Sequence, residues 1–297
     1  MAGQQQNFIS TLKNELAEHG YVADSSLAAT LLLAQGLERP VLLEGEAGVG
    51  KTDVAKALAK ARNTRLIRLQ CYEGLDAHST LYEWNYQRQL LAIKLLEHDE
   101  RSASEKEKNI FSEAYLLKRP LLEAITAEPA AVLLIDEIDR ADEAFEAYLL
   151  ELLSDYQVSI PELGTIRARS RPLVILTSNG TRELSDALRR RCLYHYVDYP
   201  DFAKELLIVQ ARVPAAPIAL ARQVVEFVQA LRGLDLRKKP GIAETLDWIS
   251  ALLQLNISTL DDNGLENIMS SLSALVKTHE DRARLTVPVV QKMVAAC

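Results

Sequence analysis

The sequence predicts an α/β fold with a parallel five-stranded sheet, followed by a smaller all-helical domain. Several short apolar runs lack the polar alternation of a half-exposed strand, as is typical of strands buried on both faces of a parallel sheet. Segments with helical apolar spacing separate these runs, and beyond residue 199 the spacing is helical only. We therefore expect one domain at 1–199 and a second at 200–297. The expected strands cover residues 40–44, 65–70, 131–135, 173–177 and 193–197.

Helices are expected on either side of this strand series. Phe8, Leu12 and Leu16 form one apolar stripe before the first strand, and Asp24 is placed to cap a second helix that ends near Leu37. The prolines in 214–217 should interrupt the chain early in the helical domain. Three series of apolar residues in that domain recur at helical spacing: Leu220, Val224, Phe227, Val228 and Leu231; Ile242, Leu246, Ile249 and Leu253; and Leu265, Ile268, Leu272, Leu275 and Val276.

A glycine-rich loop follows the first expected strand. It reads Gly45, Glu46, Ala47, Gly48, Val49, Gly50, Lys51 and Thr52, and the next helix continues with Asp53. Backbone N–H groups of such a loop can surround phosphates, the lysine can reach the β- and γ-phosphates, and the threonine hydroxyl can bind Mg²⁺. An accidental glycine-rich turn would not combine strand, loop, Lys-Thr and helix in this order. The nine residues are therefore predicted to bind ATP.

Two carboxylates end the apolar run at 131–135. Asp136 is placed to hold Mg²⁺ through water, and Glu137 to orient and polarise the attacking water. The carboxyl ends of parallel strands form the ligand crevice of an open α/β sheet, so the loop and the carboxylates can meet there. The alternative for Glu137 is an acid that stabilises a helix N-terminus.

Polar residues also end the run at 173–177. Asn179 follows Ser178 at the end of this strand and could reach the γ-phosphate or the lytic water. The alternative is an asparagine that caps the next turn.

Three consecutive arginines precede the last expected strand. Arg189, Arg190 and Arg191 lie at the end of a helical segment, where one guanidinium could stabilise charge at a neighbouring subunit's γ-phosphate. The alternatives are compensation of the helix dipole and simple solvation.

Composition restricts the other classes of protein. A hydrophobic content of 48% can fill a core, whereas no stretch approaches the roughly 20 apolar residues of a membrane span. The N-terminus lacks the basic start and apolar core of a signal peptide, so we expect a cytoplasmic protein. The net charge of −7 argues against nucleic acid as a partner. Cys71, Cys192 and Cys297 are odd in number and far apart, which predicts free thiols and no zinc.

The ordered set of phosphate loop, acidic pair, Asn179, arginine triplet and helical domain resembles an AAA+ ATPase. Residues 157–169 read as a β-hairpin inserted before the Asn179 strand, and an unusually long segment, 71–129, separates the second and third strands. Both insertions resemble the MoxR-type ATPases of the helix-2-insert group. The phrases at 82–90 and 239–248 are similar to the branch that includes the accessory ATPase of carbon monoxide dehydrogenase maturation.

This resemblance implies an AAA+ P-loop αβα domain with a helical lid. It implies a homo-oligomeric ring of six subunits that uses Mg²⁺ and ATP to remodel or mature a client protein, with a von Willebrand factor A domain protein as adaptor. Arg191 corresponds best to the arginine finger, Arg190 is the second choice, and Arg189 is expected to face solvent. The sequence departs from the AAA+ pattern at 240–245, where no sensor-2 arginine occurs, although Lys239 could replace it.

Two other functions stay open at this point. A P-loop kinase of a small substrate would need an acceptor pocket and no arginine from a neighbour. A DNA-directed AAA+ ATPase would show turnover stimulated by DNA, against the acidic balance of the chain. The aromatic residues of 72–86 alternate in a way that favours a strand or a pore-facing loop, and the alternative is a small satellite core packed on the sheet. The charged run 97–108 is expected to be a solvated loop or helix end.

Overall fold

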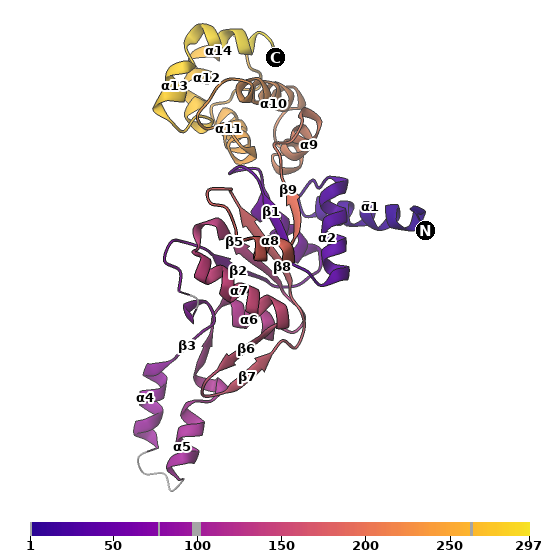
Figure 1. Ribbon diagram of the computed structural model, residues 1–297. Helices are drawn as coiled ribbons and strands as arrows, with labels where there is room; N and C mark the ends of the chain where they lie inside the picture. Colours follow the sequence, from indigo (N-terminus) through magenta and orange to yellow (C-terminus); the bar gives the residue numbers. More distant parts are fainter. Residues whose placement is uncertain (1, 77, 97–101, 262–263) are drawn as a thin grey trace. The chain divides into compact units, whose positions relative to one another are not determined.

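The computed structural model describes residues 2–76, 78–96, 102–261 and 264–297 (Figure 1). The chain forms two compact units. One comprises Met1–Ser25, Gly45–Ala57 and Tyr196–Cys297, and the other comprises Ser26–Glu44 and Leu58–His195. We refer to them as the helical unit and the sheet unit.

A five-stranded sheet organises the sheet unit. Its strands are β1 (Val41–Glu44), β2 (Leu66–Gln70), β5 (Val132–Asp136), β8 (Leu173–Ser178) and β9 (Leu193–Tyr196). Their order across the sheet is β2, β5, β8, β1, β9, and the pairs β2–β5, β5–β8 and β8–β1 are parallel. The predicted fold class is confirmed, and each strand lies within two residues of its predicted bounds. β5 is buried along its whole length, as its unbroken apolar run indicated.

Helices complete the core of the sheet unit. α6 (Pro120–Thr126) packs against β2 and β5, and its four buried side chains join those of α7 (Glu143–Asp155) in one apolar cluster. Pro120 lies in the first turn of α6. Backbone N–H groups there have no acceptor within the helix, so proline, which lacks an N–H, loses no hydrogen bond at this position. α2 (Ser25–Leu37), the 3-10 turn η3 (Ile138–Arg140) and α8 (Asp186–Arg191) are further helical elements of this unit, and α3 (Lys51–Ala61) is divided between the two units after Ala57.

Both predicted insertions are present in the sheet unit. The first contains the antiparallel pair β3 (Tyr82–Trp84) and β4 (Leu116–Lys118), with α4 (Tyr86–Leu95) and α5 (Ala103–Ile110) between them, flanked by 3-10 turns η1 (His78–Thr80) and η2 (Glu113–Tyr115). Figure 1 shows α4 and α5 side by side. The second is the expected hairpin of β6 (Gln157–Ile160) and β7 (Gly164–Arg167).

The aromatic residues of the first insertion have divided roles. Trp84 is buried and its ring lies 5.3 Å from that of Phe111, edge to face, so part of the segment is a satellite core. Tyr86 is 64% exposed and begins α4 rather than continuing a strand. Asn85 explains the change, because its side chain accepts a hydrogen bond from the Arg88 N–H and caps the helix. The charged run ends in α5, and its residues 97–101 lie outside the described ranges.

The helical unit contains the C-terminal helices that the apolar spacing predicted. Its elements are α1 (Ala2–Glu18), α9 (Phe202–Arg212), α10 (Ile218–Arg232), α11 (Ile242–Gln254), α12 (Leu265–Ser271), the 3-10 turn η5 (Leu272–Ala274), α13 (His279–Arg284) and α14 (Val287–Val294). All five predicted apolar positions of α10 are buried. The two prolines lie in the non-helical segment between α9 and α10, as predicted. On α1, Leu12 and Leu16 are buried but Phe8 is 65% exposed, which differs from the predicted stripe.

Candidate nucleotide site

The phosphate loop belongs to the helical unit and joins β1 to α3. Gly48 and Gly50 have φ values of +80° and +93°, which side chains rarely adopt, so the loop requires glycine at both positions. The buried Lys51 begins α3, and its ammonium group donates to the carbonyl oxygens of Gly45 and Glu46, both at 2.7 Å. The ammonium is thereby held across the loop that should receive the phosphates. Asp53 in the first turn of α3 pairs with Lys56 and Arg212.

A small apolar cavity adjoins the loop within the helical unit. It has a volume of about 40 Å³ and includes Tyr21, Val49, Ile242 and Leu246 in its lining. Burial, and then the charges of Asp24 and Asp53, raise the pKa of the Tyr21 hydroxyl above its ordinary value, so Tyr21 stays neutral. Sequence reasoning placed Val49 in the phosphate loop and Ile242 and Leu246 on a helical apolar face, but it did not group them with Tyr21. No motif marks this grouping, because only the fold brings Tyr21 and α11 to the loop.

The two predicted carboxylates lie in the sheet unit at the carboxyl end of β5. Asp136 is buried, and its oxygens accept hydrogen bonds from the Thr177 hydroxyl at 2.5 Å and from the Arg68 Nε at 3.0 Å. Glu137 has φ 56° and ψ 51°, a left-handed conformation that is uncommon for a residue with a side chain. Its carboxylate lies 3.3 Å from the Arg140 guanidinium and is one third exposed.

Thr177 is a functional candidate that the sequence analysis missed. Its buried hydroxyl donates to Asp136 and accepts from the backbone N–H of Glu137 at 2.9 Å. One side chain on β8 therefore fixes both carboxylate residues at the end of β5. The sequence signal that could have identified it is a threonine in an otherwise apolar strand, directly before the polar residue that ends the strand.

Asn179 lies just beyond β8, as predicted, and its backbone is fixed by Asp139. The Asp139 carboxylate accepts from the N–H groups of Asn179 and Thr181 and from the Thr181 hydroxyl. Burial acts to raise the pKa of Asp139, but these hydrogen bonds outweigh it and hold the pKa below its ordinary value. The neighbouring Ser178 is buried, and its hydroxyl accepts a hydrogen bond from the Gly180 N–H. Asn179 is partly exposed, so it is the more accessible of these two polar side chains.

The arginine triplet forms the last turn of α8. Arg190 and Arg191 are exposed, and the Arg191 guanidinium lies 3.4 Å from the Leu150 carbonyl oxygen. Arg189 does not face solvent as expected. It is half-buried, and its guanidinium pairs with Glu44 at 3.0 Å, because Glu44 ends the neighbouring strand β1 with its carboxylate toward α8.

The donor groups of two predicted residues suit Mg²⁺. The Thr52 hydroxyl and the Asp136 carboxylate are oxygen ligands of the kind that Mg²⁺ prefers. Asp136 already has a cationic partner in Arg68, so a bound ion would share or displace that contact. No group of three His, Cys, Asp or Glu side chains positioned for a metal occurs among the residues that the structure describes.

Sheet register brings the predicted residues to one edge. Asp136 ends β5, Asn179 follows β8, and β1 ends at Glu44 opposite Ser178. The chain then enters the phosphate loop at Gly45, the residue after Glu44. Cys71 also lies at this edge, and burial followed by the charge of Asp136 raises the pKa of its thiol to about 12. All three cysteines are free, as predicted.

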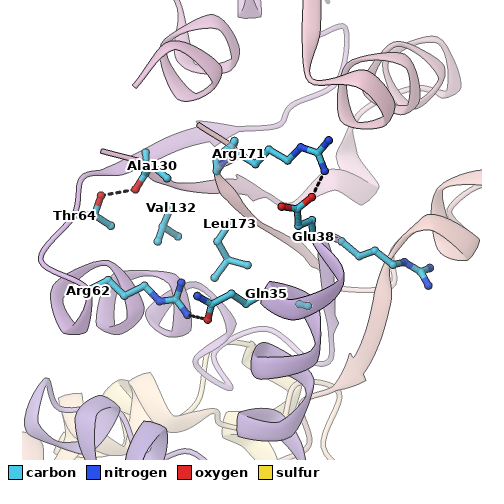
Figure 2. A pocket seen from close by; sticks show the side chains of 12 residues that line it. Gln35, Glu38, Arg62, Thr64, Ala130, Val132, Arg171 and Leu173 are labelled. Carbon is cyan, nitrogen blue, oxygen red and sulfur yellow. Dashed lines mark hydrogen bonds and ion pairs between the residues drawn. The ribbon is translucent and has the colours of Figure 1, made fainter. Parts of the chain in front are cut away.

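A separate cavity of the sheet unit lies at the opposite edge. Figure 2 shows it beside Val132 and Leu173, which begin β5 and β8. Its volume is about 300 Å³. Arg62 pairs with Gln35 there, and Arg171 pairs with Glu38. The cavity is distant in the fold from the strand ends that carry the carboxylates, so it is not part of the nucleotide site.

The family described as AAA domain (dynein-related subfamily) matches residues 40–192, just over half of the chain. The chain belongs to this family. It is therefore an AAA+ ATP hydrolase, and the matched residues include the phosphate loop, both carboxylates, Asn179 and the arginine triplet.

Individual proteins show the same relationship at lower identity. An uncharacterized protein of Staphylococcus haemolyticus is 29% identical over 74% of this chain and 78% of its own length. The gas vesicle ATPase GvpN1 of Halobacterium salinarum is 27% identical over 65% of this chain and 56% of its own. A solved structure of the RuvB Holliday junction branch migration motor of Thermotoga maritima has 18% identity and a TM-score of 0.45, over 86% of this chain and 69% of that chain. Within the described residues, no helix is long and apolar enough to cross a membrane.

Proposed function

We propose that the chain is a MoxR-like ATPase that assembles into a ring of six subunits and uses Mg²⁺ and ATP to remodel or mature a client protein. The observation that carries the proposal is the strand order β5, β8, β1. It sets Asp136, Asn179 and the entrance of the phosphate loop along one edge of the sheet. The two insertions, β3–α4–α5–β4 and β6–β7, support the MoxR-like assignment within the AAA family.

Each site residue has a role that its surroundings support. The N–H groups of the loop and the Lys51 ammonium bind the phosphates. Thr52 and Asp136 are the residues that would hold Mg²⁺, and the ion would supply positive charge at the phosphates. Glu137 orients and deprotonates the water, with Asn179 as a second polar group beside it. Thr177 keeps Asp136 and Glu137 in place through its two hydrogen bonds.

Arg191 completes the site of a neighbouring subunit in this proposal. Arg189 is less suited because Glu44 already neutralises it, whereas Arg190 and Arg191 are exposed. An arginine supplied in trans stabilises the charge that develops during phosphoryl transfer. We keep Arg191 as the finger and Arg190 as its alternative.

The two insertions are the proposed contact surfaces for the client or a von Willebrand factor A domain adaptor. Neither contains a residue of the predicted nucleotide site. The α4–α5 pair exposes Tyr86, Leu90 and Leu95, each by more than 60%, and such a concentration of exposed apolar side chains is typical of protein-binding surfaces. The carbon monoxide dehydrogenase branch stays a proposal on sequence resemblance, and a cytoplasmic location stays a proposal on composition.

Calorimetric titration with Mg·ATP tests the site. Lys51→Ala should abolish tight binding without unfolding the chain, because the Lys51 ammonium donates to two carbonyl oxygens of the loop and supplies charge to the phosphates. Lys60→Ala, an exposed lysine in the last turn of the same helix, is the matched control and should bind as the wild type does. Unchanged affinity of Lys51→Ala would refute the assignment of the site.

A further inference from the structure

The phosphate loop is held by the N-terminus of α11 through a contact between two backbones. The Ile242 N–H donates to the Gly48 carbonyl oxygen at 2.9 Å. Gly241, immediately before α11, packs so closely on the loop that a Cβ atom there would lie 2.8 Å from the carbonyl carbon and oxygen of Gly48. Gly241 has φ −87°, which any residue can adopt. Glycine is therefore required at 241 because there is no room for a Cβ atom beside Gly48, and not because of its backbone conformation.

This contact sets the direction of one loop N–H group. A trans peptide is planar, and its C=O and N–H point in opposite directions. When Ile242 holds the Gly48 carbonyl toward α11, the N–H of Val49 must point away from α11. Gly48 itself, at φ +80°, is in a region where glycine has several accessible conformations, so the peptide would otherwise be free to rotate.

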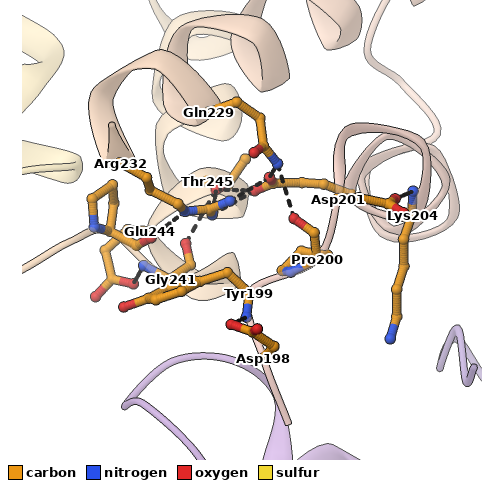
Figure 3. A network of polar contacts seen from close by, with 12 residues as sticks. Asp198, Tyr199, Pro200, Asp201, Lys204, Gln229, Arg232, Gly241, Glu244 and Thr245 are labelled. Atoms are coloured by element: carbon orange, nitrogen blue, oxygen red, sulfur yellow. Dashed lines mark hydrogen bonds and ion pairs between the residues drawn. The ribbon is translucent and has the colours of Figure 1, made fainter. Parts of the chain in front are cut away.

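A buried polar network holds Gly241 in place, as Figure 3 shows. Arg232 Nε donates to the Pro240 carbonyl at 2.8 Å, and its other nitrogens bind the fully buried Glu205 at 2.6 and 2.7 Å. The Thr245 hydroxyl lies 2.8 Å from a Glu205 carboxylate oxygen and 3.1 Å from the Gly241 carbonyl oxygen, and it can donate its one hydrogen to either. The Glu244 carboxylate accepts from the Gly241 N–H at 3.0 Å. Both sides of Gly241 are thus tied to the helices α9, α10 and α11.

We propose that Gly241 and Ile242 are positioning residues that preorganise the phosphate loop, with Arg232 as their anchor. The helical unit would then act on ATP binding through a carbonyl of the loop rather than through an arginine side chain. This inference rests on the proposed function, because it takes the Val49 N–H as a ligand of the phosphates. A donor fixed before the ligand arrives binds more tightly, since less conformational entropy is lost on binding.

Gly241→Ala in the full chain tests the proposal. The added methyl group must separate 241 from Gly48, so the dissociation constants of Mg·ATP and of inorganic triphosphate should both rise about tenfold. KM should rise while kcat at saturating ATP stays unchanged, because the lost contact is equal in the ground and transition states. Gly36→Ala is the control, since a Cβ at Gly36 meets nothing within 4 Å.

Inorganic triphosphate lacks the nucleoside, so it separates an effect on the phosphate ligands from an effect on the rest of ATP. If Gly241→Ala weakened ATP alone, the effect would lie on the nucleoside and the proposal would be wrong. Should Gly241→Ala fail to fold, Arg232→Lys keeps a positive charge beside Glu205 but loses the Nε contact to Pro240, and it should weaken triphosphate binding in the same direction. Normal triphosphate binding by Gly241→Ala or by folded Arg232→Lys, with Lys51→Ala defective, would overturn this inference and leave the proposed function standing.

Discussion

Glu137 combines a left-handed backbone with a partly exposed carboxylate. A residue with a side chain in this conformation costs free energy, and such residues cluster at functional sites. Thr177 maintains the conformation, because its hydroxyl accepts from the Glu137 N–H while donating to Asp136. The backbone therefore aims the Glu137 side chain away from the direction that a continuing strand would give it.

Replacement of Glu137 by glutamine should separate ATP binding from hydrolysis. The amide keeps the shape of the side chain but cannot accept a proton from water, so the rate of phosphate release should fall by roughly a hundredfold or more while Mg·ATP affinity is retained. Calorimetry and a phosphate-release assay check the two halves of this expectation. Glu143→Gln, an exposed glutamate on α7, is the control, and a Glu137→Gln protein with near wild-type turnover would remove Glu137 from the mechanism.

Sequence alone predicts those site residues whose proposed role follows from chain order. The phosphate loop needs a strand before it and a helix after it, and both are local patterns. Thr177 and Arg68 were missed because their function is a contact with Asp136, which is 41 and 68 residues away in the chain. Only strand register determines such contacts. The pairing of Arg189 with Glu44, 145 residues apart, was misjudged for the same reason.

At the scale of single elements, α8 depends on a residue outside it. Arg39 lies directly before Pro40 and β1, and its guanidinium donates to the carbonyl oxygens of Arg190, Arg191 and Cys192. These are carbonyls at the C-terminal end of a helix, which lack partners within it and carry partial negative charge. Arg39 therefore fixes the last turn of α8, which carries the proposed finger.

Arg39→Ala should lower hydrolysis while leaving ATP affinity unchanged. Without the guanidinium the last turn of α8 can fray and the finger loses its position, for which roughly a tenfold to a hundredfold loss in kcat is expected. Arg39→Lys should restore part of the rate. Arg171→Ala is the control and should not change kcat. Arg171 lines the cavity in Figure 2, pairs with Glu38 and stacks near Tyr156. An equal loss in both alanine variants would mean that Arg39 acts on stability alone.

The strands were predicted more accurately than the first insertion. Buried parallel strands have continuous apolar runs, which few other elements share. Residues 71–129 were recognised as an insertion by their length, but their alternating aromatic residues favoured a strand or loop through Tyr86. The structure ends β3 at Trp84 and starts α4 at Tyr86, because the Asn85 cap outweighs the alternation.

At the scale of the whole molecule, the predicted domain boundary at residue 199 stays a proposal. The two compact units are each built from separate segments that alternate along the sequence. The helical unit includes Gly45–Ala57, so the phosphate loop is grouped with the C-terminal helices and the carboxylates with the sheet. Apolar spacing could not reveal this grouping, because the contact between Gly48 and Ile242 is made by backbone atoms that every residue has.

Ring assembly predicts complementation between two inactive variants. Arg191→Ala should bind ATP but fail to hydrolyse it, because its neighbour's site lacks the finger, and Glu137→Gln should fail because its own site lacks the base. In a mixed ring, an Arg191→Ala subunit keeps Glu137 and can receive Arg191 from a Glu137→Gln neighbour. Random mixing in equal amounts gives this arrangement at about a quarter of the head-to-tail interfaces. The mixture should therefore recover a fraction of wild-type phosphate release, whereas a chain with both substitutions, mixed with either single variant, should recover none. A strictly monomeric preparation that hydrolyses ATP at the full rate would contradict a finger supplied in trans, and it would favour a P-loop enzyme that completes its site within one chain.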